Sequence, residues 1–327
     1  MQSAAPMLYN YNAKLKYIKY ENTNPQILIN YFTRVAKKEY EYDRDIAEMT
    51  AEELKETIAS LKIRRSDTRA HIISALRGYA SWARQNGRVR DTAAMDALDP
   101  DGFDTREINL NHMVRSPEHL RGILGECLDY VNCPNTSVKY ELYCWLLYAG
   151  LTIDEIRVLR KEAIDKERQV IVTGVREYAY GHIEEPLVRL WEQCASMTHI
   201  EKKNNRYSAE NAASREYIKM ELVDNENMFR PMARGNRNIH EEYMSMVSFM
   251  TLTKKILGSR ENMISANNIR ISGLYYKLYR AEREGAELTN EVFAENFGIK
   301  YTDNLTLRNN TRRYRIDYDD WKRSFDL

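Results

Sequence analysis

The segment Leu146–Leu159 reads LLYAGLTIDEIRVL and lies in the second half of the chain. The helical pattern of residues 137–149 leads into it, and Thr152 is then followed three residues later by Glu155. This T-x-x-E spacing is that of a capping box, in which both side chains satisfy backbone N–H groups at the start of a helix. A structural role therefore accounts for Thr152 and Glu155 without any catalytic one.

Helical patterns also fill the first part of the chain. Residues 25–87 place apolar side chains on helical stripes. Thr50 and Glu53 form a second capping box within this range. Ser66 is expected to precede a long helix and Gly87 to end it, because glycine commonly follows the last turn of a helix.

Two short segments depart from the helical pattern. Residues 169–173 are rich in β-branched side chains, and residues 176–180 lie between two glycines, so both are expected to be strands. The sequence therefore predicts a mainly α protein with a small antiparallel sheet in its second half.

The domain organisation follows from a polar stretch in the middle of this helical chain. The turn signal Asp99-Pro100-Asp101-Gly102 lies within it. The expected parts are an arm or extra helix over residues 1–25, a helical domain over 26–90, a linker over 91–115, and a larger, mostly helical domain over 116–327.

Charge is segregated along the first domain, although the net charge of the whole chain is only +1. Acidic residues dominate positions 39–56, and basic residues dominate positions 62–90. A basic face suits a phosphate backbone, since each neutralised phosphate releases a counterion. A merely solvated charged surface is the alternative interpretation.

Other features exclude several protein classes. The four cysteines form no CxxC pair, so we expect reduced, buried thiols, no metal site and no cofactor. No signal peptide and no apolar run long enough for a membrane span is present. We therefore expect a cytoplasmic protein with no membrane partner. The cysteines are Cys127, Cys133, Cys144 and Cys194.

The segment Leu146–Leu159 is similar to the first signature box of tyrosine recombinases and phage integrases. Residues Asn267–Gly273, with the sequence NNIRISG, resemble the second box, and Tyr314–Lys322 lies where the family places its nucleophilic tyrosine. This resemblance implies a two-domain recombinase-like architecture. Residues 26–90 would be the core-binding-like domain and residues 116–327 a degenerate catalytic-like domain.

Most positions that carry the chemistry of that family hold other residues here. Recombinases neutralise the attacked phosphodiester with two arginines, and lysine and histidine transfer the protons. Arg270 matches the second arginine. The departures from the family pattern at the other positions imply that the chain is not an enzyme and has no catalytic residue. They are Thr152 for the first arginine, Asn267 and Ile271 for two histidines, Val175 or Arg176 for the lysine, and Ile299 for the histidine of a Leu-Gly-His segment.

The layout, the block Ile269–Gly273 and the missing catalytic set are also similar to the MrpR group, inactive recombinase relatives that act as lysogeny repressors of SPβ-type Bacillus prophages. The resemblance implies a sequence-specific repressor of a temperate phage. Its partner would be double-stranded operator DNA, and its location the nucleoid of the bacterial host. The side chains expected to contact DNA are Arg64, Arg65, Arg69, Arg77, Arg84, Arg176, Arg270, Arg312 and Arg313.

Two alternatives remain open from the sequence. The chain could be a divergent but active integrase, with Tyr314 or Tyr318 as nucleophile and with Arg176 and Arg270 as the cations. It could also self-associate through its C-terminal tail, which need not exclude DNA binding.

Overall fold

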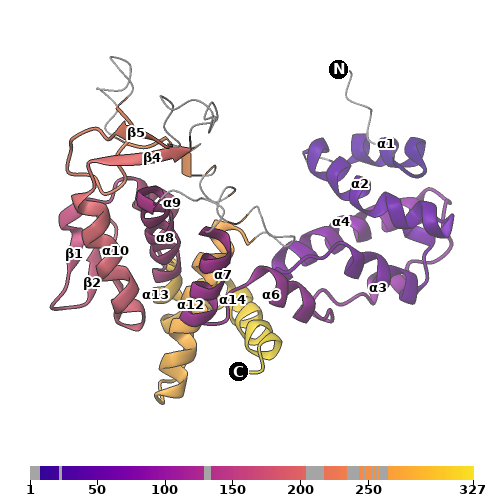
Figure 1. Ribbon diagram of the computed structural model, residues 1–327. Helices are drawn as coiled ribbons and strands as arrows, with labels where there is room; N and C mark the ends of the chain where they lie inside the picture. The colour runs from indigo at the N-terminus through magenta and orange to yellow at the C-terminus, as the bar shows by residue number, and fades with distance from the viewer. Residues whose placement is uncertain are drawn as a thin grey trace. The chain divides into compact units, whose positions relative to one another are not determined.

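A computed structural model divides the chain into two compact units (Figure 1). The N-terminal unit comprises residues 1–109 and 300–327, and the central unit comprises residues 110–299. Both units are mainly helical, and their only sheets are small and antiparallel within the part that the structure describes, so the predicted fold class is confirmed. The described residues are 8–21, 24–128, 134–203, 217–233, 243–245, 248–249, 251, 254, 257 and 264–327.

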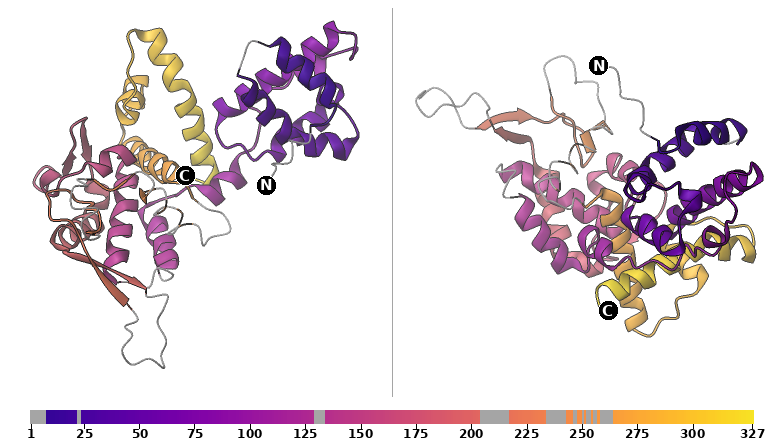
Figure 2. Two further views of the ribbon diagram at one scale, coloured as in Figure 1. Left: turned by 90° about the horizontal axis from the view of Figure 1, so that it is seen from above. Right: turned by 90° about the vertical axis from the view of Figure 1, so that its right-hand side faces the viewer.

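Helices alone build the described part of the N-terminal unit, and the last of them comes from the C-terminal end of the chain (Figures 1 and 2). This final helix, α14, packs against α4. In chain order the elements are α1 (Tyr11–Tyr20), α2 (Pro25–Tyr42), the 3-10 turn η1 (Ile46–Glu48), α3 (Ala51–Ser60), α4 (Ser66–Gln85), α5 (Ala93–Asp96), α6 (Arg106–His112), which ends in the central unit, and α14 (Asn304–Ser324).

An aromatic cluster occupies the core of this unit. Tyr17 of α1, Phe32 of α2 and Tyr79 of α4 are each at most 2% exposed. Their rings meet edge to face, with centroids 5.1 Å apart for Phe32 and Tyr79 and 5.4 Å apart for Tyr17 and Tyr79. Such pairs favour the edge-to-face arrangement because ring edges carry partial positive charge and ring faces partial negative charge.

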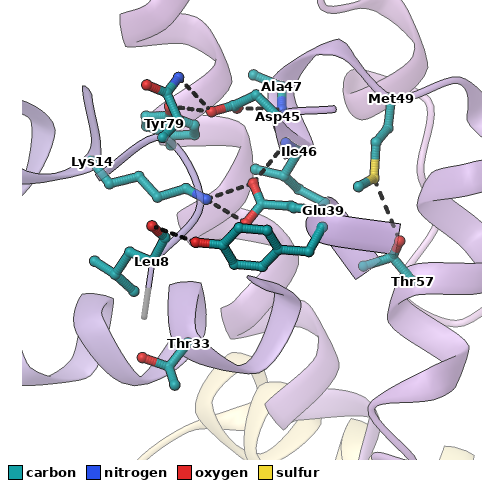
Figure 3. A network of polar contacts seen from close by, with 12 residues as sticks. Leu8, Lys14, Thr33, Glu39, Asp45, Ile46, Ala47, Met49, Thr57 and Tyr79 are labelled. Atoms are coloured by element: carbon teal, nitrogen blue, oxygen red, sulfur yellow. Dashed lines mark hydrogen bonds and ion pairs between the residues drawn. The ribbon is translucent and has the colours of Figure 1, made fainter. Parts of the chain in front are cut away.

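A buried ion pair lies beside these rings (Figure 3). The Lys14 ammonium of α1 donates to the Glu39 carboxylate of α2, and both side chains are fully buried. Glu39 also accepts from the backbone N–H of Ile46 at 2.8 Å, and this contact fixes the start of η1. Although Lys14 opposes the effect, burial raises the pKa of Glu39 above its ordinary value.

Local sequence signals set the start of α3 and the end of α4 as expected. Glu53 N donates to Thr50 Oγ1 at 3.3 Å, and Thr50 N donates to Glu53 Oε2 at 2.8 Å, so the predicted capping box is formed. The long helix α4 begins at Ser66 and ends at Gln85. Gly87 follows it with φ of 65°, a left-handed conformation that glycine adopts without a steric penalty.

Residues 91–115 differ from the expected linker. They contain α5 and α6, and Met95 and Leu98 are 2% and 3% exposed in the core of the N-terminal unit. The turn around Asp99 and Gly102 is present, but it connects packed elements. The turn-forming residues therefore indicated a turn within this segment. They did not indicate that apolar side chains anchor the segment in the core.

The central unit surrounds one apolar helix, α8 (Figure 1). Helices α10 and α12 both pack against α8, and strand β4 crosses near one end of it. The elements are α7 (Pro117–Leu128), α8 (Pro134–Ala149), α9 (Ile153–Arg157), η2 (Lys161–Ala163), β1 (Ile164–Asp165), β2 (Val170–Val172), β3 (Glu177–Ala179), η3 (Gly181–Ile183), α10 (Glu184–Ser196), β4 (His199–Lys203), β5 (Tyr217–Glu221), α12 (Ala266–Arg283) and α13 (Asn290–Phe297).

Both sheets of this unit are antiparallel. Strands β1, β2 and β3 pair in chain order, with Ile171 opposite Ile164 on one side and Tyr178 on the other. The second sheet, β4 with β5, was not expected from the sequence. Its strands carry mostly charged and polar side chains, so they lack the apolar alternation that marks a half-buried strand.

Helix α12 crosses α8 at a very short distance. A Cβ atom at Gly273 would lie 1.7 Å from the carbonyl oxygen of Tyr148, so only glycine fits this position. The neighbouring Ser272 is fully buried, and its hydroxyl accepts from Val114 N at 2.9 Å. The pair Ser272-Gly273 therefore brings the backbone of α12, with Arg270 in its first turns, next to the end of α8.

Candidate nucleic-acid interface

The position of the first recombinase arginine is occupied by a helix cap. Thr152 precedes α9, and its hydroxyl accepts from Glu155 N at 3.3 Å, while Thr152 N donates to Glu155 Oε2 at 2.9 Å. The predicted capping box is thus formed. The Thr152 side chain carries no charge, so it supplies no cation to a phosphate.

The Glu155 carboxylate collects hydroxyl donors as well. Its Oε1 atom accepts from Tyr178 Oη of β3 and from Thr173 Oγ1, the latter at 3.3 Å. Burial alone would raise the pKa of Glu155, but the hydrogen bonds from Tyr178 and Thr152 outweigh it and lower this pKa. The carboxylate therefore stays ionised, fixed between α9 and the three-stranded sheet.

Arg176 lies at the turn before β3, near the position of the family's lysine. Its guanidinium stacks over the Tyr178 ring, 4.4 Å from the centroid. Its Nη1 atom donates to the carbonyl oxygens of Glu295 and Asn296, at 3.3 and 3.4 Å, near the end of α13. Arg176 therefore ties the sheet to α13, and only its partly exposed remainder is available to a ligand.

Arg270 lies in the first turns of α12 and reaches back to the segment before α9. Its Nε atom donates to the carbonyl oxygen of Gly150 at 2.8 Å. The side chain is half-buried. Arg270, Thr152 and Arg176 therefore all lie in the central unit, in the first turns of α12, before α9 and before β3 respectively.

Tyr314 and Tyr318 both lie on α14, which belongs to the N-terminal unit. Tyr318 is 2% exposed and stacks on Trp321, with ring centroids 6.1 Å apart. Tyr314 is half-buried, and its hydroxyl accepts from Arg313 Nη2 at 2.9 Å. Packing within an aromatic cluster accounts for Tyr318.

Two arginines expected to contact DNA have structural partners that hold them in the fold. Arg69 is 2% exposed, and its guanidinium donates to the carbonyl oxygens of Ile63 and Pro100, both at 2.9 Å. Arg77 donates to the carbonyl oxygens of Met95, at 3.1 Å, and of Leu98. Both side chains therefore fasten residues 95–100 onto α4. The burial of Arg69 argues against a DNA contact, whereas the DNA contact of the partly exposed Arg77 stays a prediction.

The other expected arginines of the N-terminal unit differ in their surroundings. Arg84 is exposed, and Arg64 is half-exposed; neither side chain makes a hydrogen bond or an ion pair within the described ranges. Arg65 and Arg313 both pair with Asp67, at 2.7 and 3.1 Å. The exposed Arg312 approaches Asp101 at 3.5 Å.

The sequence models of two protein domains match the chain. The model of the MrpR N-terminal core-binding domain matches residues 8–85, and the model of the MrpR C-terminal catalytic domain matches residues 139–318. The chain belongs to the MrpR family. The resemblance to the MrpR group is thereby confirmed, and no curated protein sequence matches the chain.

Solved structures similar to this MrpR-family chain are remote. The Tn1549 transposon integrase in complex with circular intermediate DNA is 15% identical, with a TM-score of 0.38, over 93% of this chain and 95% of that one. XerA recombinase is 12% identical, with a TM-score of 0.35, over 94% and 99%. The integrase from mycobacterium phage Brujita is 12% identical, with a TM-score of 0.32, over 95% and 92%.

The described residues contain no metal-binding cluster, no disulfide bond and no membrane-spanning helix. No group of three or more His, Cys, Asp or Glu side chains there is placed to hold a metal ion. Cys127, Cys144 and Cys194 are buried and form no disulfide bond, and Cys133 lies outside the described residues. No described helix combines the length and apolar character that a membrane span requires.

Sequence reasoning missed the partners that fix these side chains. Glu155 was assigned only to its cap, whereas Tyr178 and Thr173 also bind it. The carbonyl acceptors of Arg69 and Arg77 lie 18 or more residues away, apart from those of residues 63 and 64. No spacing rule links such pairs, so the sequence offered no signal for them.

Proposed function

We propose that this chain is a sequence-specific, double-stranded DNA-binding repressor of a temperate phage, which maintains lysogeny and performs no strand exchange. It would act at operator sites in the cytoplasm of the bacterial host, on the nucleoid. In this proposal residues 26–90 form the core-binding-like DNA-binding domain, and the catalytic-like domain within residues 116–327 keeps a binding role.

The state of the Thr152 position carries this proposal. Strand cleavage by a tyrosine develops negative charge on the phosphate, and preorganised cations stabilise that charge. Here the hydroxyl of Thr152 caps α9, and Arg270 Nε donates to the Gly150 carbonyl. Asn267 and Ile271 have no group that transfers protons near neutral pH. Such a site favours binding over cleavage.

The proposed DNA contacts are the arginines that are not held entirely by the fold. Arg64, Arg84 and Arg312 are the leading candidates in the N-terminal unit, with Arg65 and Arg313 if their pairs with Asp67 open. Arg176 and Arg270 are the candidates in the central unit. Phosphate contacts of this kind set affinity and register, and base contacts set specificity.

Covalent trapping on a nicked suicide substrate tests the absence of cleavage. The DNA for this assay is the operator fragment recovered by genome-wide footprinting in the presence of the protein. We expect a footprint and no covalent protein–DNA band. A covalent band that disappears in Tyr314→Phe or Tyr318→Phe would show an active integrase and overturn the proposal.

Operator binding itself is tested by the salt dependence of affinity. We expect log Kd to rise linearly with log salt concentration, with a slope that reports the number of phosphates neutralised. Arg270→Ala should weaken binding to operator and to unrelated DNA by similar factors. A variant that melts like the parent and still binds operator equally well at physiological salt would remove Arg270 from the interface.

A further inference from the structure

A hollow of 390 Å³ lies in the central unit between the three-stranded sheet and α12. Three basic side chains line it: His182 of η3, and Lys277 and Arg280 of α12. The remaining lining residues are Gln169, Ala179, Gly181, Ala281 and Glu284. Neither the recombinase resemblance nor the proposed DNA contacts account for this hollow.

His182 has an unusual position in it. The Nε2 atom is shielded from solvent, and it has no hydrogen-bond partner in the described part of the chain. The ring lies between Tyr148 of α8 and Tyr276 of α12, with each centroid 6.2 Å away. A buried polar atom without a partner is rare in folded proteins, because it loses its hydrogen bonds to water without replacement.

The charges around His182 are mostly positive. Arg280 is paired with Glu284 at 3.1 Å. Lys277 makes no hydrogen bond or ion pair with any described residue, although the Glu295 carboxylate attracts its charge and the Arg176 guanidinium repels it. Burial lowers the pKa of His182 to about 4, and the charges of Lys277 and Arg280 act in the same direction.

We propose that this hollow binds a small anion through a carboxylate or phosphate group. The oxygens of the anion would accept hydrogen bonds from Lys277 and Arg280, and the negative charge would lie beside the His182 ring. Charge-assisted bonds of this kind are stronger than bonds between neutral groups. The volume of the hollow limits the ligand to a small molecule.

Binding of this anion would be linked to protonation of His182. A negative charge beside the imidazole favours its protonated form, which opposes the effects of burial, Lys277 and Arg280. The facing groups on the other elements are the Tyr148 and Tyr276 rings and the Glu284 carboxylate. The anion should therefore bind more tightly as the pH falls toward the range in which His182 accepts a proton.

The test is an NMR titration of the full chain with ring-labelled histidine. The His182 signal is assigned by its loss in His182→Asn, and ionic strength is held constant with chloride. Inorganic phosphate and citrate are added separately. We expect saturable shifts of the His182 signal and a rise of its titration midpoint by about one pH unit. The anion that saturates at the lower concentration identifies phosphate or carboxylate as the preferred group.

Two variants of α12 distinguish a specific binding site from the general attraction of anions to positive charge. Lys277→Gln should weaken the preferred anion by roughly tenfold, the usual effect of losing one charge-assisted hydrogen bond. Arg283→Gln removes an equal charge from the same helix outside the hollow and should leave the affinity unchanged. Equal weakening by both variants, or a His182 midpoint that neither anion moves, would overturn the proposal. The titration does not involve DNA, so a chain that fails to bind operator DNA can still give either outcome for the anion site.

Discussion

Asp317 caps a helix that begins 251 residues earlier in the chain. Its Oδ1 atom accepts from the backbone N–H of Ser66 at 3.3 Å, at the first residue of α4. Arg65, which precedes Ser66, offers no side-chain cap to α4. Asp317 is 5% exposed, so a carboxylate of α14 fills the buried start of α4, where the helix dipole favours negative charge.

We expect Asp317→Ala to destabilise the N-terminal unit by about 1–3 kcal/mol, because it removes a cap and leaves a buried N–H without a partner. Asp317→Asn keeps an acceptor oxygen and should cost less. Urea denaturation measures both. The matched control is Glu107→Gln on α6, an exposed carboxylate. If Asp317→Ala unfolds at the same urea concentration as this control, the cap contributes nothing to stability.

The sequence predicted the helix starts whose partners lie within one turn. Thr50 with Glu53 and Thr152 with Glu155 are three residues apart, so a spacing rule finds them. Asp317 is outside the reach of any such rule. For the candidate site, the resemblance located Thr152 and Arg270, but it did not give the carbonyl and hydroxyl partners that decide what these side chains can do.

The pair Lys14–Glu39 makes a second prediction about the N-terminal unit. Lys14→Met leaves the Glu39 carboxylate buried without its cation and should cost about 3–5 kcal/mol. Adding Glu39→Gln removes the unpaired charge and keeps an acceptor for Ile46 N, so the double variant should recover much of that loss. Urea denaturation of the two variants and the parent provides the comparison. A double variant less stable than Lys14→Met would contradict this account.

Glu39 also predicts how stability depends on pH. Because burial raises its pKa in the folded chain, the folded state holds more protons than the unfolded state above pH 4.5, the ordinary value for this group. The free energy of unfolding should therefore decrease as the pH rises from 4.5 to about 7, the raised pKa of Glu39. The decrease from this group is at most about 1.4 kcal/mol per pH unit. Denaturation at several pH values should show a flatter profile for Lys14→Met with Glu39→Gln than for Glu107→Gln. Parallel profiles would remove Glu39 as the cause.

Two glycines of the central unit should respond in opposite directions to alanine. At Gly273 the added Cβ would lie 1.7 Å from Tyr148 O, which forces α12 away from α8. Gly273→Ala should cost at least about 3 kcal/mol or prevent folding of this unit. Gly122 in α7 has open space, so Gly122→Ala should stabilise by about 0.5–1 kcal/mol. Thermal melts measure the stability of both variants. Two variants of equal stability would argue against the close crossing of α12 and α8.

Arg77 and Arg84 lie on the same helix and were expected to act alike, yet their surroundings predict different outcomes. Arg84 is exposed and has no described partner, so Arg84→Ala should leave stability unchanged, weaken DNA binding at every sequence and reduce the salt slope by about one. Arg77 holds the carbonyl oxygens of Met95 and Leu98, so Arg77→Ala should lower the melting temperature. Fluorescence anisotropy at four salt concentrations, together with thermal melts, measures both effects. An Arg84→Ala protein with an unchanged salt slope would place this end of α4 away from DNA, because a lost phosphate contact must release one counterion fewer.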